Sequence, residues 1–341
     1  MDVFRMEAEK ALGEQIFRNT PSQYDLFEIP SRGSMAIHLP RGSLPVARLR
    51  RGAFEWAGAE SMGPSLKLVK VDFEPATRQI LYTTADDILE LFRCLELDTY
   101  MLYMMYRDIM GFHQVGVRQS VRSPNESVFN FFVNVEPLKV LWSFNTTNLA
   151  TKGIVLTRVT PGGRACYHDF CRLLEQYSPL IAHPLLPAFA VVLDIVAFSD
   201  KIVNKQEEVV SQTELKTGFS PWSLDVCYDF TRPAELDKFS SISQKMGASL
   251  VELEDVMRHM KIMQRIITSL QEHGNQYWSA YASEHEKVCI QTAHEDISQV
   301  LSLTRPQLEY AELYTGYLRE RAKNQLTVVS QQSNKDVMVV D

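Results

Sequence analysis

The pattern of apolar and polar positions divides the chain into a mixed front part and a helical back part. Apolar residues alternate with polar ones over 66–73, 129–135 and 140–144, which predicts β-strands because strand side chains point to alternate faces. Residues 154–159 are rich in β-branched side chains and predict another strand, and 79–82 a further short one. The connections between several of these segments are short, which favours antiparallel neighbours.

Helical spacing of apolar residues marks other segments of the front part. These are residues 4–17, 85–95, 97–110, 167–177 and 184–216. Thr84 is a suitable N-cap for the second of them, and Gly218 a suitable stop for the last. Residues 19–64 are rich in Pro, Gly, Ser and Arg, and we expect loops with short extended pieces there.

The back part carries a heptad pattern. Steps of four and three residues link Met246, Leu250, Leu253, Met257, Met260 and Ile267. This spacing predicts one helix over 234–273 with a seam that needs a partner helix. A second helical stretch covers 284–304, and Pro306 is expected to break or restart it before it continues to Leu326.

Together these patterns predict an α+β fold. The expected architecture is an N-terminal α/β domain with a largely antiparallel sheet flanked by helices, followed by a long helical hairpin or coiled-coil stalk. The predicted divisions are 1–64 for an N-terminal helix and irregular lead, 65–218 for the α/β domain, 219–330 for the stalk and 331–341 for a frayed tail.

Composition is ordinary for a globular protein of this length. The 341 residues are 45% hydrophobic and 23% charged, and the net charge of -7 argues against a broad nucleic-acid surface. Five cysteines without a CxxC pair make a disulfide framework improbable, and a charged N-terminus does not resemble a signal peptide. We therefore expect a cytoplasmic protein. The longest uncharged run, 176–193, contains three prolines and indicates a buried helix rather than a membrane span.

No catalytic motif is present. Cys166, His168, Asp169 and Cys171 are close in sequence, but zinc sites need a second ligand pair, so packing is the favoured interpretation. No phosphate loop, dinucleotide loop or nucleophile elbow occurs, and no cofactor is indicated. An enzyme with an unrecognised site stays a minor alternative that a deep pocket with convergent titratable groups would support.

One acidic cluster suggests a cation. Glu252, Glu254 and Asp255 lie within one turn of the predicted long helix, and hard oxygen ligands of this kind suit Mg²⁺. A solvated helix face is the simpler interpretation. The three carboxylates are the candidates for a divalent-cation site, with Mg²⁺ as the expected ion.

Three strings resemble fungal CorA-like magnesium transporter proteins. Residues 112–118 (FHQVGVR) resemble a Phe-His-x-x-Gly-x-Arg string of that family, and 183–187 (HPLLP) a helix start. Residues 317–329 (YLRERAKNQLTVV) are similar to its stalk helix. The resemblance covers roughly 85–330 and implies an α/β cytoplasmic domain followed by long helices. In the family two membrane helices and a Gly-Met-Asn pore motif come next, and this chain ends before either.

The resemblance implies a non-enzymatic CorA-like cytoplasmic domain, related to magnesium and divalent-cation transporters, that is truncated before the pore and does not conduct ions alone. Its expected partners are a second copy of the chain or a full-length CorA-like protein, bound through the helical arms. The alternative is an interaction or regulatory module that binds another partner through the same helices.

Overall fold

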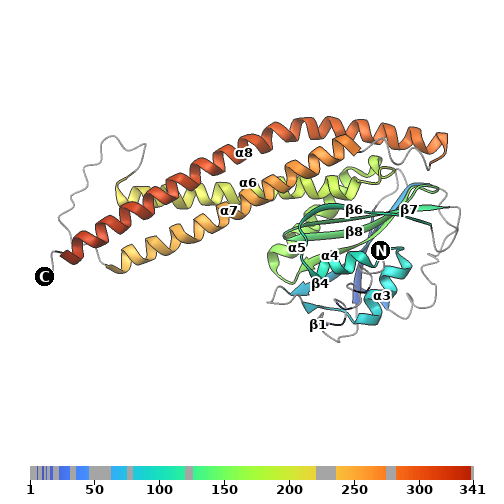
Figure 1. The fold of residues 1–341 in the computed structure, drawn as a ribbon, viewed down its shortest axis with the longest axis horizontal. Coiled ribbons are helices and arrows are strands. Elements are labelled where there is room, and N and C mark those ends of the chain that lie inside the picture. Colours follow the sequence, from blue (N-terminus) through green and yellow to red (C-terminus); the bar gives the residue numbers. More distant parts are fainter. Residues whose placement is uncertain are drawn as a thin grey trace. The chain divides into compact units, whose positions relative to one another are not determined.

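The computed structural model divides the chain into two compact units (Figure 1). The described residues are 16–17, 23–30, 36–45, 63–74, 80–119, 126–219, 236–273 and 282–338, with positions 6, 10 and 13. The first unit comprises Met1–Asp194 and Arg265–Leu303, and the second Ile195–Gln264 and Thr304–Asp341. The predicted boundaries at 64/65, 218/219 and 330/331 stay predictions.

A nine-stranded sheet among the described residues forms the first unit. Its strands are β1 Ile16–Phe17, β2 Gln23–Ile29, β3 Ile37–Pro45, β4 Ser65–Glu74, β5 Ile80–Leu81, β6 Gly111–Gln119, β7 Ser127–Val135, β8 Leu138–Asn145 and β9 Ala150–Arg158. The order is β1-β5-β4-β9-β8-β7-β6, and β2 pairs with both β3 and β4. Only β1–β5 and β4–β9 are parallel among the described pairs. The prediction of an α+β fold with a largely antiparallel sheet is confirmed.

The four strands β6 to β9 form an antiparallel meander, as their short connections predict. Every residue of β8 is buried, so both of its faces are covered. Trp142 lies opposite Gly153 in the β8–β9 register. A Cβ atom on Gly153 would come within 2.3 Å of the Leu141 carbonyl oxygen, so only glycine fits there.

Three helices accompany the sheet: α3 Ala85–Cys94, α4 Tyr100–Tyr106 and α5 Pro161–Gln176. The predicted cap is confirmed, because the Thr84 hydroxyl accepts the Asp87 N–H at 3.1 Å. The helix expected over 97–110 is shorter, since the chain turns at Asp108 with a φ of 52° and continues as β6. The helix expected from 167 begins earlier, because Thr160 caps it and Pro161 takes a position in its first turn.

Several N-terminal predictions need correction. The segment 19–64, expected to be loops, contributes β2 and β3 to the sheet. Strand β2 lies between β3 and β4 in the sheet and is buried. The composition of its segment is typical of loops, so the sequence pattern did not reveal this strand. Ile16 and Phe17, placed at the end of a predicted helix over 4–17, pair with β5 as a strand. Most of that predicted helix lies outside the described residues.

Three long helices complete the chain: α6 Leu186–Thr217, α7 Leu236–His273 and α8 Glu284–Met338. Gly218 ends α6 with a φ of 72°, as predicted. The expected break at Pro306 is wrong, because α8 continues through it. Thr304 and Leu308 are buried on either side of the proline, and their packing offsets the lost backbone hydrogen bond. The helix also extends into the predicted frayed tail, as far as Met338.

None of the described helices combines the length and the apolar character that crossing a bilayer requires.

Candidate interaction surface on the long helices

The second unit is a bundle of α6, α7 and α8 segments that lie side by side (Figure 1). Its apolar centre consists of Val210 from α6, Met246 from α7 and Ala322 from α8. Partly buried Leu250 and Leu326 pack against it. The predicted stalk is therefore a three-helix arrangement within this unit rather than two arms, because α6 supplies a third apolar face.

The buried stripe on α7 is wider than the heptad spacing predicted. Met246, Leu253, Met260 and Ile267 are fully buried, as expected for seam positions. The companion positions are Ser249, Val256, Met263 and Leu270, which are also buried, whereas Leu250 and Met257 are only half-buried. The predicted steps of four are thus steps of three, because α7 buries a stripe broad enough for more than one neighbouring helix.

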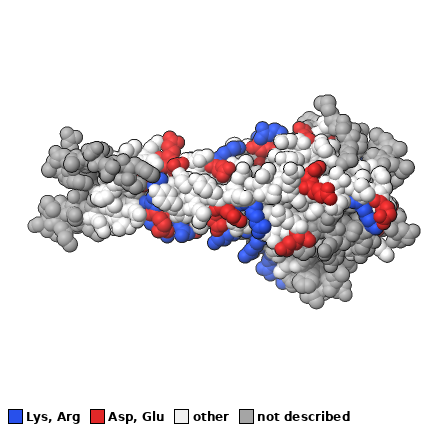
Figure 2. Space-filling model, turned by 90° about the horizontal axis from the view of Figure 1, so that it is seen from above, with Lys and Arg blue, Asp and Glu red and all other residues white. Residues whose placement is uncertain are grey.

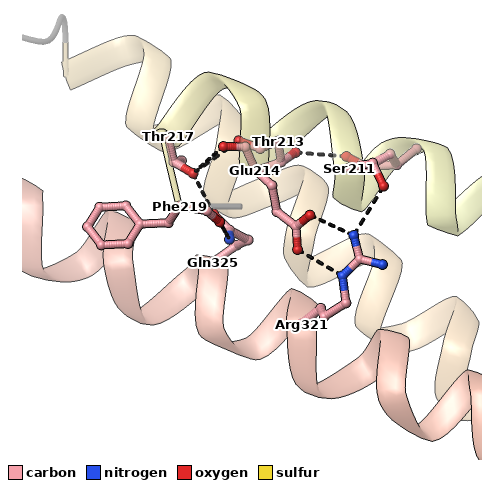
Figure 3. Close-up of polar contacts among 8 residues, drawn as sticks. Ser211, Thr213, Glu214, Thr217, Phe219, Arg321 and Gln325 are labelled. Carbon is pink, nitrogen blue, oxygen red and sulfur yellow. Dashed lines mark hydrogen bonds and ion pairs between the residues drawn. The ribbon is translucent and has the colours of Figure 1, made fainter. Parts of the chain in front are cut away.

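A buried ion pair joins α6 to α8 (Figure 3). The Arg321 guanidinium donates to both carboxylate oxygens of Glu214, at 2.9 and 2.6 Å, and to the Ser211 hydroxyl at 3.2 Å. The side chains of Arg321 and Glu214 are only 9% and 2% exposed. The hydrogen bonds that Arg321 donates to Glu214 raise the pKa of Arg321 above its ordinary value.

Next to this pair, a second set of hydrogen bonds closes the end of α6 (Figure 3). The Thr217 hydroxyl donates to the Gln325 side-chain oxygen at 2.6 Å. The Gln325 amide in turn donates to the Phe219 carbonyl oxygen at 2.7 Å. These bonds fix the helix-ending turn at Gly218 against α8.

Polar contacts also link α7 to α8. Arg319 donates to Glu254 at 2.9 Å, and Gln264 donates to Glu312 at 2.7 Å. The Thr315 hydroxyl lies 4.0 Å from the Met260 sulfur in the buried seam. The register between these two helices is therefore set by specific pairs as well as by apolar packing.

The three carboxylates proposed for magnesium each interact with different side chains. Glu252 accepts a hydrogen bond from Gln206 and lies 3.7 Å from the Lys205 ammonium. Glu254 pairs with Arg319, and Asp255 pairs with Arg258 at 3.1 Å. Among the residues that the structure describes, no group of three or more His, Cys, Asp or Glu side chains is placed to hold a metal ion. The magnesium site stays a prediction.

The cysteine cluster behaves as a packing element. Cys166 and Cys171 are buried on the inner side of α5, whereas His168 is exposed and Asp169 pairs with Arg172 at 3.0 Å. Burial raises the pKa of the Cys171 thiol to about 12. The favoured interpretation of these residues as packing agrees with this placement.

The outward side of α8 is unusually apolar. Tyr310, Leu313 and Tyr317 are 69%, 76% and 45% exposed, although Leu308, Thr315 and Leu318 on the inward side are fully buried. Tyr310 and Tyr317 are one heptad apart, with Leu313 between them, which is the spacing of a helix-packing seam. We call Tyr310, Leu313 and Tyr317 the outer seam.

Aromatic contacts hold the outer seam in place. The Tyr314 ring lies between those of Tyr310 and Tyr317, with centroids 6.3 Å away on each side. The Arg321 guanidinium lies 5.5 Å from the centroid of Tyr317, so the buried ion pair also supports this ring. Desolvation, together with a hydrogen bond to Glu207, raises the pKa of Tyr314 to about 12.

Charges beside the outer seam are balanced. Arg305 pairs with Glu309 at 3.6 Å, and Lys323 pairs with Glu320 at 2.9 Å. Figure 2 likewise shows both signs of charge interspersed on the face that it presents. A surface of this kind can meet a copy of itself without like-charge repulsion.

The first two strings that resemble CorA-like proteins make contacts that connect secondary-structure elements. In residues 112–118, which lie on β6, Phe112 stacks on Phe131 and Arg118 pairs with Asp98 at 3.3 Å. Gly116 takes a φ of 134° where the β6–β7 register shifts. In residues 183–187 the Trp142 indole N–H donates to the Pro184 carbonyl oxygen at 2.7 Å and fixes the entry to α6.

Residues 317–329 lie on α8 and contain Tyr317 of the outer seam together with both Arg321 and Gln325. Sequence reasoning missed the outer seam, although the spacing of Tyr310 and Tyr317 was visible. It also missed the Glu214–Arg321 pair, for which the sequence carries no signal because the two residues lie on different helices far apart in the chain.

Comparison with known proteins finds a likeness among solved structures. No protein-family model matches the chain, and no curated protein matches it. Among solved structures, the soluble domain of CorA from Methanocaldococcus jannaschii is similar, with a TM-score of 0.42 and 8% sequence identity. The likeness covers 90% of this chain and 97% of that one. Neither the score nor the identity supports an inference about function.

Proposed function

We propose that this chain is a non-enzymatic CorA-like domain whose long helices associate with a second copy of the chain through the outer seam. The observation that carries the association is the apolar outward side of α8, where Tyr310 and Leu313 are 69% and 76% exposed. Large exposed apolar side chains at heptad spacing are typical of a helix that lacks a partner.

Two features favour a second copy as the occupant. The charges beside the outer seam are paired within the chain, Arg305 with Glu309 and Lys323 with Glu320, so they do not oppose the approach of a second copy. The seam also lies on a helix that is already held on its inward side by the Glu214–Arg321 pair, so little ordering of the helix is needed on association.

The relation to the cytoplasmic region of magnesium transporters rests on the sequence strings. Residues 112–118 lie on β6 of the sheet, and residues 183–187 lie at the start of α6, where Pro184 accepts a hydrogen bond from Trp142. Residues 317–329 lie on α8. The expectation that the chain does not conduct ions by itself stays a prediction.

Sedimentation equilibrium of the purified chain tests the association. We expect a mass that rises with concentration for the unchanged chain, and a monomer for Tyr310→Glu/Leu313→Glu, because charges in the centre of an apolar interface abolish binding. Val251→Glu is the matched control, since Val251 is 64% exposed on α7 and lies outside the seam. A monomeric unchanged chain, or a double variant that associates normally, would contradict the proposal.

A further inference from the structure

A groove between α6 and α7 in the second unit collects positive charge. Its volume is about 250 Å³, and Lys205 and Lys216 from α6 and Lys245 from α7 line it. All three lysines are exposed. Three cations around one small depression are notable on a chain with a net charge of -7.

Two of these lysines make no ion pair with the residues that the structure describes. Glu252 is the one carboxylate among the residues that line the groove, and it already binds Gln206 and Lys205. Within the described part of the chain, neither Lys216 nor Lys245 makes an ion pair. By contrast, Arg258 on α7 pairs with Asp255 at 3.1 Å.

The floor of the groove is polar and buried. Gln206, Thr213 and Ser249 line it and are 3%, 4% and 3% exposed. The Thr213 hydroxyl donates to the Val209 carbonyl oxygen at 2.9 Å. The buried Ser249 hydroxyl can donate to a bound acceptor. A buried hydroxyl together with two ammonium groups that make no ion pair with the described residues suits an anion with several acceptor oxygens.

We propose that this groove binds the phosphate groups of a small polyanion. Lys216 and Lys245 would pair with phosphate oxygens from the two helices, and the Ser249 hydroxyl would donate from the floor. Phosphate is favoured because it carries more than one negative charge on a compact set of acceptors, and lysine ammonium groups bind it as flexible point charges. The site goes beyond the proposed function, since it uses a different side of the bundle.

Isothermal titration calorimetry of the full chain with sodium tripolyphosphate tests the groove. We expect saturable binding of one ion per chain, weakened at least about 10-fold in Lys216→Gln/Lys245→Gln, as for the loss of charge-assisted hydrogen bonds. Ser249→Ala should weaken it less. Lys261→Gln is the matched control, because Lys261 is exposed on α7 outside the groove, and it should bind like the unchanged chain.

Vesicles containing phosphatidylinositol phosphate distinguish the two sources of phosphate. Capture of vesicles that the double lysine variant loses, and that tripolyphosphate competes away, assigns the groove to a lipid headgroup. Tripolyphosphate binding without vesicle capture assigns it to a free phosphate compound. The proposal is overturned if the unchanged chain binds neither probe, or if the double lysine variant binds as tightly as the unchanged chain.

Discussion

Replacing Glu214 by glutamine probes the buried ion pair most directly. The change leaves Arg321 buried at 9% side-chain exposure, with its charge uncompensated. The two short bonds at 2.9 and 2.6 Å lose their ionic character, although the amide oxygen can still accept one of them. Removing one partner of a buried pair costs about 3–5 kcal/mol, and we expect the lower end of this range, about 3 kcal/mol.

Urea unfolding followed by far-ultraviolet circular dichroism measures this loss, because the signal comes mainly from the helices. Glu208→Gln is the matched control on the same helix. Glu208 is exposed and accepts one hydrogen bond from Gln212, so its replacement should change the free energy of unfolding by less than about 0.5 kcal/mol.

A double replacement separates charge burial from packing. Glu214→Leu/Arg321→Met removes both charges and keeps apolar volume, and we expect its stability to return to within about 1–2 kcal/mol of the unchanged chain. If Glu214→Gln unfolds at the same urea concentration as the unchanged chain, or if the double variant is less stable than the single one, the reasoning about an uncompensated charge is wrong.

Three further predictions concern two glycines, a histidine and a buried cysteine. Gly153→Ala should lower the free energy of unfolding by about 2–4 kcal/mol, whereas Gly316→Ala on α8, where a Cβ meets nothing within 4 Å, should raise it by about 0.5–1 kcal/mol in the same urea assay. Burial lowers the pKa of His294 below its ordinary 6.5, so the unfolded chain binds the proton first as pH falls. Stability should therefore decrease on acidification through about pH 6.5, and less so in His294→Gln; equal pH dependence would contradict this assignment. Native alkylation followed by peptide mass spectrometry should leave Cys171 unmodified while the partly exposed Cys289 reacts, and rapid labelling of Cys171 would refute its burial.

The outer seam and the phosphate groove place the two proposed activities on different helices of the same bundle. The seam is on α8, and the groove is between α6 and α7. Variants of Tyr310 and Leu313 should therefore leave phosphate binding unchanged, and variants of Lys216 and Lys245 should leave association unchanged. The two experiments can fail independently.

Local patterns were enough for much of the fold. Strands β4, β7, β8 and β9 were visible from alternation or β-branched composition, and Thr84 and Gly218 from cap chemistry, since these signals depend on a few neighbouring residues. The sequence predicted the long helices and the burial of Met246 and Met260 in the same way. It did not predict β2 and β3, because β2 joins the sheet by pairing with β4, a strand further along the chain, and β3 joins it by pairing with β2.

Tertiary packing decided the features that depend on distant partners. Whether α8 breaks at Pro306 is a balance between one lost backbone bond and the burial of Thr304 and Leu308, and only the packed helix settles it. The Glu214–Arg321 pair and the lysine groove each combine residues from two helices. Sequence determines which side chains are available at short range, but long-range assembly determines which charges meet a partner and which remain open, because that depends on distances that no local pattern encodes.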